Sequence, residues 1–174
     1  MEELKTLELR RDKVQKISEI RDAIVGFESD LRKMPGSLIG DSPEYLKICP
    51  LRHTFVDGAY VRELSMPKSL LFVSKIHKVE HPYFILKGDV SVLTEDGIIR
   101  VKAPFYGVTP PGTKRIIWTH EDTVWVTVHV TNSKNLTEIE EEIIAKTYDD
   151  LNIIDAEHEE VRDFIEKVKG DENV

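Results

Sequence analysis

The chain has 174 residues, of which 40% are hydrophobic and 32% charged, with a formal net charge of −8 and a sequence pI of about 5.3. This length fits one domain with appendages. The negative charge opposes contact with a phosphate backbone, so nucleic acid is not an expected partner. The single cysteine, Cys49, excludes an internal disulfide and is expected to be a small buried residue. No apolar run approaches the ~20 residues of a membrane span, and the N-terminus has no apolar signal core, so we expect a cytosolic protein.

Residues 1–36 are predicted to form an N-terminal helical segment. Apolar side chains recur three or four positions apart over 2–33, at Val14, Ile17, Ile20, Ile24, Phe27 and Leu31. The sequence Met34-Pro35-Gly36 ends the helix, because proline cannot continue it. Two partners for its apolar side stay open: the protein's own barrel and a second subunit. Residues 37–52, with Gly40, Pro43 and Pro50, are predicted to be a linker or arm.

Residues 53–132 have a β pattern, in which short runs rich in β-formers alternate with turn signals. This spacing is typical of a barrel or sandwich. Asp96-Gly97 lies between two such runs and predicts a hairpin. From Thr123 to Thr131, polar and aromatic residues alternate with valines, which predicts a strand with two distinct faces. We favour the inward placement of the face that carries Trp125, Thr127 and His129, because tryptophan prefers burial.

Residues 133–174 are predicted to be C-terminal helices. Thr137-x-x-Glu140 reads as a capping box that opens a helix through about Tyr148. A second helix is expected from about Ala156 to Lys169.

The histidines concentrate in the β region, which holds five of the six. His77 and His81 lie in the densest polar stretch, 75–88. Imidazole is a common ligand for transition metals, so these two side chains are a candidate metal site. His129 is a candidate third ligand that leaves one position open for water or substrate. As core histidines with hydrogen-bond partners, they need no metal, and this alternative stays open.

The stretch 77–131 resembles the cupin superfamily. Gly88 matches the closing glycine of the first cupin motif, which aligns His77 with the second motif histidine, Lys75 with the first and His81 with the acidic ligand. Pro110-Pro111-Gly112-Thr113-Lys114-Arg115 resembles the second motif, with Arg115 in place of its histidine. The resemblance implies a mainly β fold: a cupin-type double-stranded β-helix, or jelly-roll barrel, with N- and C-terminal helices. It also implies a homo-oligomer and a divalent metal such as zinc, iron, manganese or nickel, although only His77 is an unaltered ligand match.

A finer similarity is to cupin-like proteins of tailed bacteriophages. It rests on residues 53–63, 75–81, 111–115 and 121–125, and it implies a protein of the host cytoplasm or the virion, with other phage proteins as candidate partners. Three functions stay open: a small-ligand binder with or without a metal, a virion structural or assembly scaffold, and a metal-dependent isomerase or dioxygenase. The positive groups suggest a small anionic ligand, with Lys75, Tyr83, Lys114 and Arg115 as candidate binding residues. Alternatively, these cations pair with nearby carboxylates such as Glu80, Glu121 or Asp122.

Overall fold

The structure, a computed structural model, describes residues 2–38, 40 and 42–151, with side chains from residue 9 onward. Its elements in chain order are α1 (Glu2–Lys33), α2 (Pro43–Ile48), β1 (Leu51–Val56), β2 (Ala59–Met66), β3 (Leu71–Val73), β4 (Ile76–His77), β5 (His81–Lys87), β6 (Asp89–Thr94), β7 (Gly97–Lys102), β8 (Phe105–Thr109), β9 (Ile116–Thr119), β10 (Thr123–Val130), α3 (Leu136–Ile143), β11 (Ile144–Ala145) and a 3₁₀ turn (Tyr148–Asp150). The helix predicted at 156–169 lies outside the described residues, as does His158.

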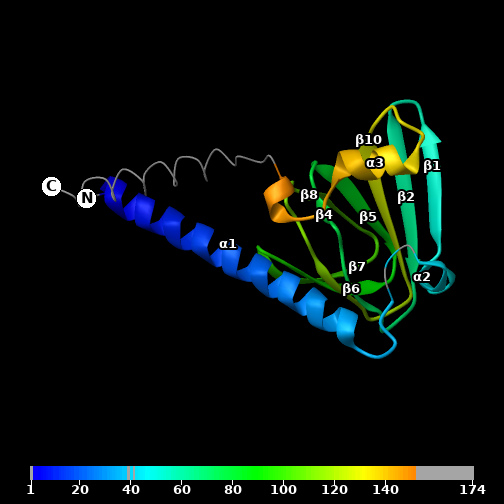
Figure 1. Ribbon diagram of the computed structural model, residues 1–174, viewed down its shortest axis with the longest axis horizontal. Coiled ribbons are helices and arrows are strands. Elements are labelled where there is room, and N and C mark those ends of the chain that lie inside the picture. Colours follow the sequence, from blue (N-terminus) through cyan, green and yellow to red (C-terminus); the bar gives the residue numbers. More distant parts are fainter. Residues whose placement is uncertain (1, 39, 41, 152–174) are drawn as a thin grey trace.

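Two antiparallel sheets form the body of the protein (Figure 1). The larger has the strand order β1-β2-β10-β5-β8, and the smaller has the order β3-β9-β6-β7. Their inner faces meet in one core, to which the larger sheet contributes Leu64, Met66, Tyr83, Ile85 and Trp125 and the smaller sheet Val90, Val92 and Ile117. Antiparallel sheets packed in this way confirm the predicted jelly-roll barrel.

Two local predictions in the barrel are confirmed. The Asp96-Gly97 turn joins β6 to β7, with Thr94 opposite Gly97. In β10, Trp125, Thr127 and His129 are buried, whereas Val130 on the other face is 86% exposed. The inward face of β10 is therefore the one that carries the indole, hydroxyl and imidazole groups.

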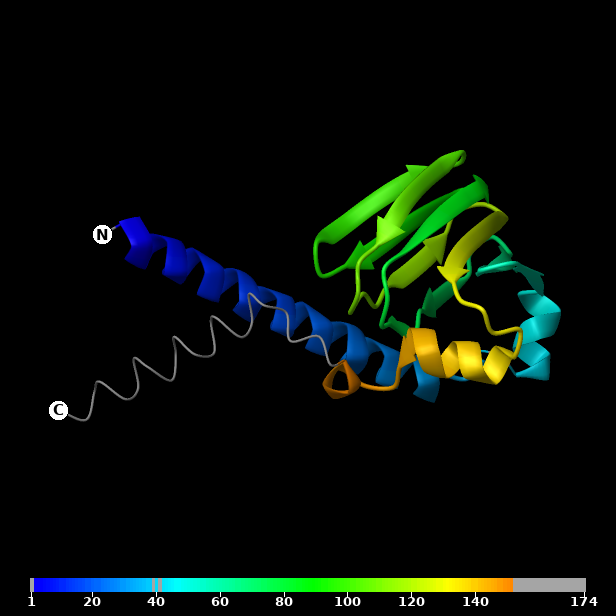
Figure 2. The same cartoon turned by 90° about the horizontal axis from the view of Figure 1, so that it is seen from above.

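The helix α1 matches its predicted range and ends directly before Met34-Pro35-Gly36. Its C-terminal half packs on the protein's own barrel: Ile24 is fully buried, and Arg21 and Glu28 pair with Glu95 and Lys114. Its N-terminal half extends beyond the barrel (Figures 1 and 2). No helix within the described ranges is long and apolar enough to cross a membrane.

The C-terminal helix prediction was wrong in its cap and its length. The N-cap of α3 is Asn135, whose side-chain oxygen accepts a hydrogen bond from the Thr137 amide at 2.9 Å, in place of the predicted capping box. The helix ends at Ile143 instead of Tyr148, because Ile144 and Ala145 pair with β4 as strand β11. The predicted linker at 37–52 contains α2 and the first two residues of β1.

Candidate ligand-binding site

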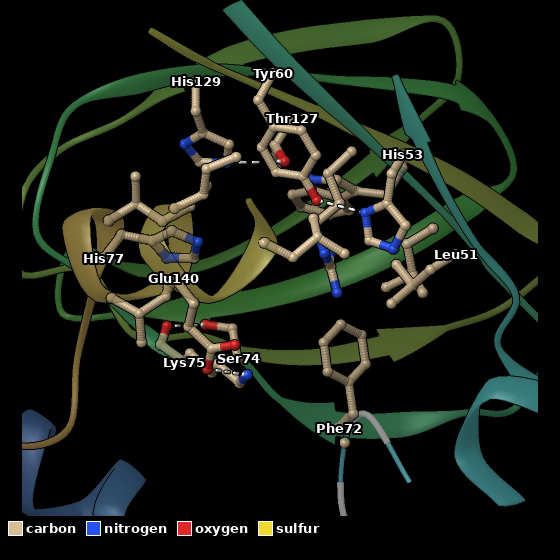
Figure 3. Close-up of a pocket in the computed structure, with 18 of the residues that line it drawn as sticks. Leu51, His53, Tyr60, Phe72, Ser74, Lys75, His77, Thr127, His129 and Glu140 are labelled. Atoms are coloured by element: carbon tan, nitrogen blue, oxygen red, sulfur yellow. Dashed lines mark hydrogen bonds and ion pairs between the residues drawn. The ribbon is translucent and has the colours of Figure 1, made fainter. Parts of the chain in front are cut away.

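A cavity of about 550 Å³ opens into the barrel interior. Residues of β1 and of the β3–β4 stretch line it, and these are edges that do not pair with each other. Apolar side chains of α3, Leu136, Ile139 and Ile143, also contribute to the wall. Figure 3 shows polar groups gathered around this space, and the polar members of the full lining are Tyr45, His53, Tyr60, Arg62, Ser74, Lys75, His77, Arg115, Thr127, His129 and Glu140.

Arg115 is placed by a short backbone ladder between residues 74–77 and 112–115. The Ser74 amide donates to the Arg115 carbonyl at 2.8 Å, the His77 amide to the Thr113 carbonyl at 3.2 Å, and the Gly112 amide to the His77 carbonyl at 2.7 Å. The Ser74 hydroxyl accepts from the Arg115 amide at 2.9 Å. This ladder brings the segment of the second cupin-like motif next to His77, so both sequence motifs meet at one site.

The Arg115 side chain is 5% exposed and lies against the barrel aromatics. One of its terminal nitrogens donates to Thr109 Oγ1 at 2.6 Å, and Cζ lies 5.0 Å from the Tyr83 ring centre and 5.9 Å from that of Trp125. Burial lowers the pKa of Arg115, but a guanidinium stays charged in proteins. Within the described part of the chain, no carboxylate forms a salt bridge with it. The cavity therefore contains a buried positive charge without a protein counter-ion among these residues.

A second guanidinium, that of Arg62, lines the same cavity. Arg62 lies on the inner face of β2, opposite Thr127 of β10. It forms no salt bridge with any described carboxylate, and its charge lowers the pKa values of His77 and His129. Two cations that no carboxylate of the described part of the chain neutralises therefore face one space.

Three histidines form a cluster beside these arginines. The ring centres of His77 and His81 are 4.5 Å apart, those of His81 and His129 are 4.4 Å apart, and those of His77 and His129 are 6.2 Å apart. His77 and His129 line the cavity, and His81 is also buried. The structure thus brings His77, His81 and His129, the three candidate metal ligands of the sequence analysis, into one cluster.

The histidine cluster is neutral at pH 7. Burial is the largest cause that lowers the pKa of each ring: that of His129 falls to about 3, and that of His77 lies well below its ordinary value. Neighbouring imidazoles and the charge of Arg62 lower the pKa values of His77 and His129 further, and the charge of Arg115 lowers those of His77 and His81. A neutral imidazole keeps one nitrogen as an acceptor.

Each ring has one buried nitrogen to which no described group forms a hydrogen bond: Nδ1 of His77, Nε2 of His81 and Nδ1 of His129. His81 Nδ1 lies 3.1 Å from the Val79 carbonyl, which only accepts, so this nitrogen carries the proton and Nε2 keeps its lone pair. Neutral imidazoles with spare nitrogens have the chemistry of metal ligands. As arranged, however, no group of three His, Cys, Asp or Glu side chains in the described residues is suited to hold a metal ion. The predicted metal set of His77, His81 and His129 stays a prediction.

The other predicted ligand-binding residues lie at different places. Lys75 is at the cavity wall, where its ammonium pairs with Glu140 at 2.6 Å. Lys114 faces α1, pairs with Glu28 at 2.8 Å and is absent from the cavity wall. Tyr83 lies beneath Arg115 and stacks on Trp125 with ring centres 4.8 Å apart. Of the four, Arg115 alone presents a buried charge to the cavity without a carboxylate partner among the described residues.

Sequence reasoning missed Arg62 as a site residue. Its signal was the alternation along β2, where Tyr60, Arg62 and Leu64 share the inward face. It also missed the pair formed by His53 Nδ1 and the Tyr60 hydroxyl, 2.6 Å apart at the cavity wall. Neither His53 nor Tyr60 belongs to a sequence motif that predicts a binding site.

The sequence matches no protein-family model and no curated protein. Solved structures similar to this chain include protein NMB1881 from Neisseria meningitidis, at 13% identity over 47% of this chain and 82% of that one, with a TM-score of 0.41. A cupin-2 domain protein from Shewanella frigidimarina is similar at 11% identity over 47% of this chain and 79% of that one, with a TM-score of 0.40. The Schizosaccharomyces pombe Cnp3 cupin domain is similar at 18% identity over 53% of this chain and 64% of that one, with a TM-score of 0.41. The fold is of the cupin type. The strand order and pairing of the two sheets show this fold.

Proposed function

We propose that this protein binds a small anionic ligand inside its cupin-type barrel. The observation that supports the proposal is Arg115, a buried guanidinium at the cavity wall with no carboxylate partner among the described residues. Arg62 adds a second positive charge to the same space.

The energetics favour a ligand as the missing counter-ion. A buried charge without a partner costs folding free energy, and a buried charge pair broken on one side typically loses about 3–5 kcal/mol. The Thr109 hydroxyl and the faces of Tyr83 and Trp125 offset part of that cost. An anion bound to Arg115 would offset the remaining cost. Its attraction to the guanidinium would be strengthened by the low dielectric constant of the barrel interior.

The test is the thermal unfolding midpoint in chloride buffer with added acetate, phosphate or 3-phenylpropanoate. We expect at least one anion to raise the midpoint of the wild type in a concentration-dependent way, as a ligand of the folded state does. Arg115→Gln should abolish the shift, whereas Arg52→Gln, on an exposed cation of β1 that pairs with Glu63, should keep it. Equal shifts in all three proteins would contradict an anion site at Arg115.

A divalent metal at His77, His81 and His129 is a second proposal. The proton of His81 Nδ1 on the Val79 carbonyl leaves Nε2 free, which is the arrangement that outer partners impose on metal-binding histidines. The side chains would have to turn to converge on an ion, and the nearby charge of Arg115 opposes it. Elemental analysis of untagged protein and of the His77→Ala/His81→Ala double variant decides: about one metal per chain, lost in the variant, supports the site.

A third proposal is a virion scaffold built from copies of this chain. Exposed apolar side chains lie on the outer face of the larger sheet, at Val56, Leu86, Tyr106, Val108 and Val130. An exposed apolar patch of this kind is typical of a surface that contacts another protein. Light scattering of the purified chain should give a homo-oligomer without added ligand, and Tyr106→Lys should dissociate it; a monomeric wild type would rule out self-assembly of the isolated chain.

A further inference from the structure

The inner face of the larger sheet is divided into layers by strand register. His129 lies opposite Tyr60, and the next layer places Thr127 opposite Arg62 and Tyr83. The layer after that holds Leu64, Trp125 and Ile85 in register. Along the barrel, the interior therefore changes from imidazole groups through a guanidinium to purely apolar side chains.

The cavity spans this change of polarity. Its charged part is formed by Arg62 and Arg115, and its apolar part by Leu51, Leu64, Phe72, Ile117 and Trp125. The volume of about 550 Å³ is in the range of sites that enclose most of a small organic molecule. A bare inorganic ion would use only the charged part and leave the apolar walls against water.

We infer, resting on the proposed anion site, that the ligand is a carboxylate that carries an apolar body. The carboxylate matches the planar fork of Arg115 and lies near Arg62. The body packs on Phe72, Ile117 and Trp125, where the burial of its apolar surface strengthens binding. A phosphate could use the same two arginines, but it would leave Phe72, Ile117 and Trp125 facing water.

Titration calorimetry on the full chain tests this inference with four probes: 3-phenylpropanoate, its neutral amide 3-phenylpropanamide, acetate and inorganic phosphate. We expect 3-phenylpropanoate to bind at least tenfold more tightly than each of the other three, because it alone combines a carboxylate with a body. Phe72→Ala, which leaves both arginines in place, should weaken 3-phenylpropanoate binding about five- to tenfold and change acetate binding by less than twofold. Arg52→Gln serves as the control.

The outcomes separate the ligand class from the anion site. If acetate or phosphate binds as tightly as 3-phenylpropanoate and Arg115→Gln abolishes that binding, the inferred class is wrong and the anion site stands. If the amide binds as tightly as the acid, the protein recognises the apolar body and not the negative charge, and both proposals fail. If Phe72→Ala leaves 3-phenylpropanoate affinity unchanged, the apolar part of the cavity is not the binding wall. If no anion binds in an Arg115-dependent way, the anion site itself is refuted.

Discussion

The two ends of the barrel interior are about equally buried but differ in what holds them together. At the apolar end, Ile85, Val90 and Val92 are at most 1% exposed, and burial there stabilises the fold directly. At the polar end, Arg115, His81 and His129 are at most 5% exposed, yet among the described residues the arginine has no carboxylate partner and each histidine has one buried nitrogen without a hydrogen bond. Groups of the second kind reduce stability, which is the reason why we propose a binding role for the polar end.

The largest effect that follows from this comparison is expected at the apolar end. Ile85→Ala should lower the free energy of unfolding by about 2–5 kcal/mol, because it leaves a cavity in a fully packed region. Its neighbour Leu86 is 58% exposed, so Leu86→Ala should change the value by less than about 0.5 kcal/mol. Urea denaturation measures both; similar losses in the two variants would contradict the assigned faces of β5.

A substitution at Gly88 measures how closely the chain after β5 approaches Asp122 and Thr123 at the start of β10. Its φ is +104°, and a Cβ there would lie 2.8 Å from the Asp122 carbonyl oxygen. Gly88→Ala should therefore cost about 1–3 kcal/mol, from strain and from the clash. Gly58 has a φ of +76° but open space around it, so Gly58→Ala isolates the strain and should cost less. An equal loss of stability in the two variants would show that the clash with Asp122 does not contribute to the cost at Gly88.

Acid should destabilise the polar end. The folded-state pKa of His129 is lowered to about 3, so between pH 6.5 and pH 3 the unfolded chain binds a proton there that the folded chain does not. Stability is therefore lost as the pH falls through this window. From pH 7.5 to pH 5, wild type should lose about 1–2 kcal/mol more than His129→Gln in urea denaturation. Parallel pH profiles for wild type and His129→Gln would contradict the neutral cluster.

The smallest effect is expected at the cavity wall near α3. Lys75 and Glu140 are about half exposed, so their ion pair should contribute only about 0–1 kcal/mol. A double-mutant cycle of Lys75→Ala and Glu140→Gln by urea denaturation measures the coupling. A coupling above about 2 kcal/mol would make this pair a structural clamp instead of a surface contact.

The sequence predicted the periodic and local parts of this molecule well. The spacing of apolar residues located α1, and alternation located the inward face of β10, because both depend on near neighbours in the chain. The end of α3 was wrong because Ile144 pairs with His77, a contact that local patterns do not contain. Motif alignment selected Lys114 and Arg115 together, but the structure places Lys114 against Glu28 of α1 and Arg115 in the barrel. Arg62 belongs to the stretch 53–63 but to no ligand motif, so the alternation along β2 was its signal in the sequence, and the register with Thr127 places it at the site.

The most direct test of the account compares Arg115→Met with wild type in urea denaturation, without and with 3-phenylpropanoate. If Arg115 serves ligand binding, the variant should be at least as stable as wild type without the anion, because an apolar side chain removes an unpaired buried charge. With the anion at about 100 times its Kd, wild type alone should gain about 2.7 kcal/mol. A variant that loses more than about 2 kcal/mol without the anion, beside a wild type that does not respond to it, would make Arg115 a structural residue and contradict the account.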